Sequence, residues 1–104
     1  MTTINFICGD SIHSVDAPED TTAMWNALQN GVNGIVGECG GDLSCASCHV
    51  YVPEAWQDML SSPSLAESEL LEVLDSHMPN SRLSCQIIVK PDLEGLTLEV
   101  APQN

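Results

Sequence analysis

Four of the five cysteines place the strongest constraint on how this chain can fold. Cys39, Cys45 and Cys48 fall within ten residues of one another, and 36 residues separate Cys48 from Cys85, which gives the pattern C-x5-C-x2-C-x36-C. Thiolates are the ligands that soft metal centres prefer. The spacing therefore predicts a fold in which a remote cysteine returns to a local cysteine loop.

Glycines surround the first three cysteines. They stand at positions 37, 40 and 41, where they permit backbone conformations closed to other residues and remove side chains that would block a close approach. A loop that wraps an inorganic centre needs this freedom, because its backbone amides should turn inward and donate hydrogen bonds to sulfur.

Three kinds of site could use these thiolates. Zinc accepts four cysteines, usually as two close pairs, but here only Cys45 and Cys48 form a C-x2-C pair. A thiol-redox site on that pair would leave Cys39 and Cys85 unused. An iron–sulfur cluster uses all four cysteines, and the lack of a C-x2-C-x2-C run favours the two-iron over the four-iron form.

The charge balance is extremely acidic. Fifteen Asp and Glu residues stand against Arg82 and Lys90, for a net charge of −13. Such a surface repels nucleic acid and anionic lipid, because binding to phosphate needs cationic side chains. It attracts a basic protein surface and speeds encounter with it. An oxidised two-iron centre with four thiolates adds about −2, so we expect a rather negative reduction potential.

Length and hydropathy predict one globular domain over residues 1–104. Residues 1–8 lack the basic start and long apolar run of a secretory signal. No stretch approaches the roughly 18 apolar residues that span a bilayer. Five cysteines without a secretion signal favour metal over disulfides. We therefore expect a monomeric, cytoplasmic protein of bacterial type rather than an organellar protein that has lost its presequence.

Hydrophobic periodicity predicts an α+β domain with a mixed sheet, because strands open and close the chain and helices fall between them. Asp20, Thr21 and Thr22 supply a helix N-cap signal, and Gly31 a stop signal. The first helix should bury Met24, Ala27 and Leu28. Strands are expected over residues 3–8, 11–15, 49–52, 86–89 and 96–100, and helices over 23–29, 54–60 and 64–74.

The third expected helix has a capping box at Ser64 and Glu67 and an acidic surface. Its apolar stripe consists of Leu70, Leu71 and Leu74. Its carboxylates are expected on the remaining surface and repel one another at i,i+3 spacing: Glu67, Glu69, Glu72 and Asp75. A binding role would explain this repulsion, and a solvated helix face is the simpler alternative.

No catalytic apparatus accompanies the cysteines. His13, His49 and His77 lie in different segments with no matching nucleophile, and no phosphate-binding glycine motif follows a strand. Four occupied ligands also leave no open metal position for a substrate. The sequence therefore predicts an electron carrier and not an enzyme. Cys8, at a strand end, is interpreted as a small buried hydrophobe.

The complete pattern resembles the adrenodoxin/putidaredoxin class of 2Fe-2S ferredoxins. Cys39-Gly-Gly, Cys48-His49 and Arg82-Leu-Ser-Cys85-Gln-Ile carry the resemblance, which spans essentially the whole chain. Plant-type ferredoxins have four residues between the first two ligands and fit less well. The resemblance implies a β-grasp fold and one 2Fe-2S cluster whose ligands are Cys39, Cys45, Cys48 and Cys85.

The same resemblance implies a one-electron shuttle. Its members take electrons from an FAD-containing, NAD(P)H-dependent ferredoxin reductase and pass them to a cytochrome P-450 or to the iron–sulfur assembly machinery. A zinc-stabilised interaction module is the alternative from another class. His49 and Arg82 would brace the cluster loop. The residues that would meet basic partner surfaces are Glu38, Glu67, Glu69, Glu72 and Asp75.

Overall fold

The chain opens with a β-hairpin, as the alternation of apolar and polar residues predicts. The computed structural model describes residues 2–32, 35, 48–60, 62–74 and 77–101. In it, β1 (Thr2–Cys8) pairs antiparallel with β2 (Ser11–Ala17). Gly9 in the turn has a φ of +60°, which glycine adopts without steric cost. The hairpin buries Ile4, Phe6, Val15 and Ala17.

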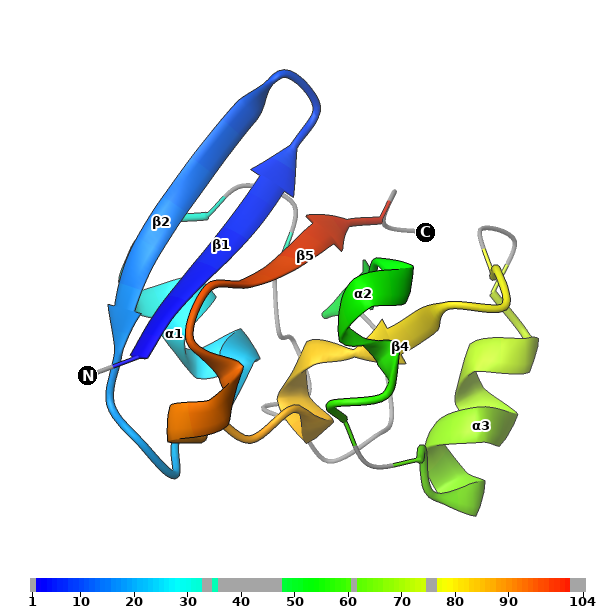
Figure 1. The fold of residues 1–104 in the computed structure, drawn as a ribbon. Coiled ribbons are helices and arrows are strands. Elements are labelled where there is room, and N and C mark those ends of the chain that lie inside the picture. Colours follow the sequence, from blue (N-terminus) through cyan, green and yellow to red (C-terminus); the bar gives the residue numbers. More distant parts are fainter. Residues whose placement is uncertain (1, 33–34, 36–47, 61, 75–76, 102–104) are drawn as a thin grey trace.

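The hairpin is one edge of a five-stranded mixed sheet in the order β2-β1-β5-β3-β4 (Figure 1). β5 (Leu96–Val100) lies between β1 and β3 and is parallel to β1 and antiparallel to β3. β3 (His49–Tyr51) in turn pairs antiparallel with β4 (Ser81–Leu83). This mixed sheet, with helices in the connections, is the α+β β-grasp architecture that the sequence predicts.

The first helix, α1 (Ala23–Gln29), begins and ends as predicted. The Thr22 hydroxyl caps it by accepting a hydrogen bond from the Trp25 N–H, and Gly31 follows the helix with a φ of +66°. Met24 and Ala27 are buried, but Leu28 is 40% exposed. The prediction that Leu28 faces the core is therefore wrong. Asn26 is buried instead, and its amide is satisfied by Thr21 and Thr22.

The strand expected over residues 86–89 does not form. Its first residue, Gln86, belongs to a 3₁₀ helix, η1 (Ser84–Gln86). Residues 87–89 pair with the segment at the start of α1. Ala23 N–H donates to Ile87 O, and Val89 N–H donates to Thr21 O. β5 occupies the place between β1 and β3, and the 86–89 segment, in which Ile87 and Val89 are buried, lies beside the start of α1 instead.

The other two helices are shorter than predicted: α2 covers Glu54–Gln57 and α3 covers Leu65–Glu72. Leu71 of α3 is buried and its stripe partners Leu70 and Leu74 are partly buried, as predicted, where α3 stands beside β4 (Figure 1). Met59, which follows α2, is 44% exposed. No helix in the described ranges is both long enough and apolar enough to cross a bilayer.

Candidate functional site

The fold brings Cys48 and Cys85 together from distant parts of the sequence. Cys48 immediately precedes β3, and Cys85 lies in η1, directly after β4. The two strands are neighbours, with His49 opposite Leu83. Ser84 then donates twice to the Cys48 carbonyl oxygen, from its N–H at 3.0 Å and from its hydroxyl at 2.8 Å. Strand pairing and these two bonds fix both cysteines in one place.

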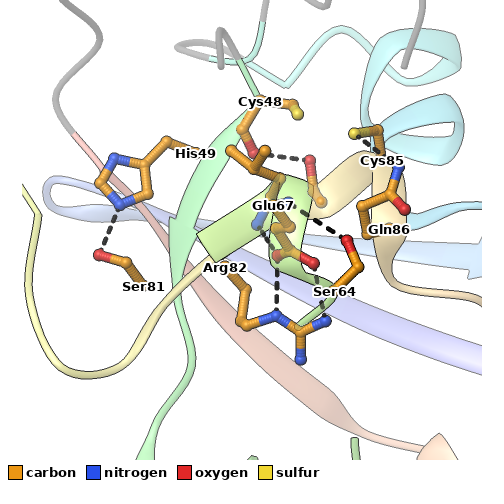
Figure 2. A network of polar contacts seen from close by, with 10 residues as sticks. Cys48, His49, Ser64, Glu67, Ser81, Arg82, Cys85 and Gln86 are labelled. Atoms are coloured by element: carbon orange, nitrogen blue, oxygen red, sulfur yellow. Dashed lines mark hydrogen bonds and ion pairs between the residues drawn. The ribbon is translucent and has the colours of Figure 1, made fainter. Parts of the chain in front are cut away.

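The two thiols form a buried, interacting pair (Figure 2). Cys48 is 1% exposed and Cys85 is 6% exposed, and neither is in a disulfide. A hydrogen bond with Cys48 lowers the pKa of Cys85 to about 7, whereas the same contact, together with burial, raises the pKa of Cys48. The Cys85 thiol can therefore lose its proton near neutral pH, and the resulting thiolate suits the binding of a soft cation.

The remaining predicted ligands, Cys39 and Cys45, lie outside the described residues, as do the predicted partner contacts Glu38 and Asp75. In the part of the chain that the structure describes, no group of three or more His, Cys, Asp or Glu side chains could hold a metal. The Cys48 and Cys85 pair nevertheless fits two of the four thiolate positions of a 2Fe-2S cluster, because both side chains are buried, interact with each other and flank the paired strands β3 and β4.

Glu67 does not lie on the surface. Its side chain is enclosed and forms an ion pair with Arg82, at 2.8 Å from Oε2 to Nε and 3.2 Å from Oε1 to Nη2. Oε2 also accepts a hydrogen bond of 2.9 Å from the Leu83 N–H. The prediction that Glu67 faces a partner protein is therefore wrong, because a carboxylate that is 1% exposed cannot contact one.

The Glu67 contacts connect α3 to the cysteine pair (Figure 2). The Ser64 hydroxyl caps α3 by accepting a bond from the Glu67 N–H, which is one half of the predicted capping box. The Glu67 carboxylate binds β4 residues Arg82 and Leu83 instead of completing the box. Ser84 comes directly after Leu83 and binds Cys48. The four consecutive residues 82–85 therefore join α3 to both cysteines.

His49 is a buried neighbour of Cys48. Its Nε2 lies 2.7 Å from the Ser81 hydroxyl oxygen, which also accepts a hydrogen bond from the Met78 N–H. Burial, helped by the charge of His77, lowers the pKa of His49 to about 4, so the ring is neutral at physiological pH. His49 and Arg82 are both buried, but the cluster loop that they are expected to brace lies outside the described residues.

Two of the predicted partner contacts, Glu69 and Glu72, are exposed on α3. They share their surface with two apolar side chains, Leu65 at 76% exposure and Val73 at 73%. Residues 65, 69, 72 and 73 follow helical spacing and lie on one side of the helix. The outward surface of α3 is thus mixed, with carboxylates and apolar groups next to one another.

Sequence reasoning missed the roles of three residues at this site. Ser84 and Gln86 bind the two cysteines, and Glu67 forms a buried ion pair. The available signal was Arg82, one of only two Lys and Arg residues, which stands three residues before Cys85. A buried arginine needs an acidic partner. The fifth cysteine, Cys8, ends β1 and is only partly buried against the core, where burial raises the pKa of its thiol.

Comparison with known proteins agrees with this geometry. Residues 6–90 match the family described as a 2Fe-2S iron-sulfur cluster binding domain, a range that contains all four predicted ligands. The chain is 47% identical over 88 residues to ferredoxin CarAc of Sphingomonas sp, a match that covers 85% of this chain and 81% of the relative. It is 44% identical over 87 residues to putidaredoxin of Pseudomonas putida, covering 83% and 81%.

Solved structures agree over the whole fold. The chain superposes with a TM-score of 0.93 on a crystal structure of the covalent putidaredoxin reductase-putidaredoxin complex, at 38% identity, covering 98% of this chain and 100% of the matched chain. The hairpin and the mixed sheet are therefore those of an established structural family.

Proposed function

This chain belongs to the 2Fe-2S ferredoxins of the putidaredoxin type, and from that premise we propose that it carries single electrons from an FAD-containing, NAD(P)H-dependent reductase to a cytochrome P-450. Ferredoxins of this type bind one 2Fe-2S cluster and are electron carriers without substrate chemistry of their own. The zinc-stabilised module is therefore set aside. The proposed setting is the bacterial cytoplasm, with the protein acting as a monomer.

The proposed cluster ligands are Cys39, Cys45, Cys48 and Cys85. The buried contact between Cys48 and Cys85 supports two of them. When bound, the cluster accepts and releases one electron at a time. The protein's own part is to position the sulfurs through the Ser84 bonds to Cys48 and to exclude water from both thiolates.

The observation that carries the reductase proposal is the structural match itself. The matched chain with a TM-score of 0.93 comes from a covalent complex between putidaredoxin and its reductase. A chain with the same fold and 38% identity can present the same surface to a flavoprotein. The acidity of the chain, at a net charge of −13, adds long-range attraction to any basic reductase surface.

We propose the outward surface of α3 as the docking surface. Glu69 and Glu72 supply charge that speeds encounter, and the exposed Leu65 and Val73 supply apolar area that water leaves on contact. Glu38 and Asp75 belong to the same proposal. Because Glu67 anchors α3 to the strand that leads to Cys85, a partner on α3 is held in a constant position relative to the cluster.

Reconstitution tests the function directly. The purified protein should be reduced by a ferredoxin reductase and NAD(P)H, followed by bleaching of its visible absorption, and should then support substrate turnover by a cytochrome P-450 from the same genome. Reduction without any transfer to a P-450, together with restored cluster assembly in a depleted extract, would assign the protein to cluster biogenesis instead.

A further inference from the structure

Gln86 donates a hydrogen bond to the sulfur of its neighbour Cys85, with 3.4 Å between Nε2 and Sγ (Figure 2). We propose that this side-chain amide tunes the cluster, raising its reduction potential and so setting how easily the carrier is loaded with an electron. The inference rests on the proposed function, since it requires Cys85 to be a cluster ligand.

The physical effect follows from the charge on the ligand sulfur. Reduction adds one negative charge to a centre that is already anionic, and part of that charge resides on the thiolates. An N–H dipole aimed at sulfur therefore stabilises the reduced state more than the oxidised state. Cys85 is only 6% exposed, so water screens this interaction weakly.

The backbone that carries the Gln86 side chain is held in place by its local structure. Gln86 is the last residue of η1, whose backbone closes with a bond from the Ile87 N–H to the Ser84 carbonyl oxygen. The same Ser84 is bound to Cys48. A neutral amide also keeps its donor at every pH at which the protein is folded, so the effect is permanent and not switched.

Gln86 lies in the wall of an open groove and not in the core. The groove has a volume of about 310 Å³, and Met59, Ile88 and Leu93 also line it. Because the side chain is only half-buried, replacing it removes the hydrogen bond without leaving a closed cavity. The tuning role can therefore be separated from a packing role.

The test is a redox titration of the loaded protein with no partner present. Gln86→Met keeps the length of the side chain and removes the donor. At a fixed potential we expect about a tenfold lower ratio of reduced to oxidised protein, or about 59 mV for one electron. Gln86→Glu also adds a negative charge and should lower the potential further. Gln57→Met is the matched control, because the Gln57 amide donates to the Val52 carbonyl oxygen instead.

A spectroscopic measurement tests the contact independently of the reduction potential. Pulsed EPR of the reduced wild type should show an exchangeable proton coupled to the cluster that disappears in Gln86→Met, which has no N–H to donate. The proposal is overturned if Gln86→Met titrates like Gln57→Met, or if Gln86→Met retains that proton. Reductase assays distinguish this proposal from the proposed function. If Gln86→Met shows the expected shift in potential but the reductase does not reduce the wild type, only the proposed function is overturned.

Discussion

Glu67 and Arg82 form a buried ion pair in which both carboxylate oxygens are bound, at 2.8 and 3.2 Å from the guanidinium. It joins α3, the proposed docking helix, to β4, the strand that leads to Cys85. The pair is thus the mechanical connection between the outer surface and the cysteine pair.

Glu67→Gln should lower the stability of the protein strongly. The variant removes the negative charge that binds Arg82 in this buried pair, and breaking a buried ion pair costs about 3–5 kcal/mol. Urea denaturation followed by far-UV circular dichroism and by visible absorption would measure the change. Glu69→Gln is the control, and because its side chain is exposed its effect should stay within about 0.5 kcal/mol. Equal midpoints for the two variants would mean that the ion pair contributes nothing net.

Serine substitutions should separate the ligand cysteines from Cys8. Replacing any one of Cys39, Cys45, Cys48 or Cys85 removes a thiolate from the cluster, so the purified variant should contain far less iron and sulfide and should lose its visible absorption. Cys8→Ser should keep two irons per chain, since Cys8 belongs to the β1 end. Full iron content in a Cys85→Ser variant would exclude Cys85 as a ligand.

The double variant Glu69→Gln and Glu72→Gln should slow reduction by the reductase at low salt by roughly three- to tenfold and flatten the salt dependence of the rate. Stopped-flow measurements over a range of ionic strength would show both effects. Asp10→Asn with Asp16→Asn is a matched control that removes two exposed charges from the hairpin. If both double variants behave alike, net charge and not the α3 surface drives encounter.

Replacing Leu65 and Val73 with serine should weaken reductase binding by roughly five- to tenfold, because apolar area on α3 no longer leaves water on contact. The salt dependence should remain that of the wild type, since no charge has changed. Binding calorimetry would give the affinity. Ile12→Ser removes an exposed apolar side chain from β2 instead and should leave the affinity unaltered; a similar loss in that control would argue against a specific α3 contact.

Local patterns in the sequence predicted local structure well. The hairpin, the Thr22 cap of α1 and the last strand follow from alternation and capping signals that depend only on neighbouring residues. The 86–89 segment was misread as a strand, because a short apolar run is buried equally well in a sheet or under a helix. Which of these occurs depends on β5, ten residues later in the chain, occupying the sheet position between β1 and β3.

For the site, the sequence alone determined the ligand chemistry, because thiolate spacing and glycines near Cys39 are properties of a short segment and of one remote cysteine. Only the tertiary structure decided which acidic residues are exposed and which are buried. Glu67 and Glu69 are two residues apart on one helix, yet packing of α3 on β4 buries the first against Arg82 and leaves the second in water. Composition counts both as charge, whereas the packing makes Glu67 part of a structural ion pair and leaves Glu69 exposed on the proposed docking surface.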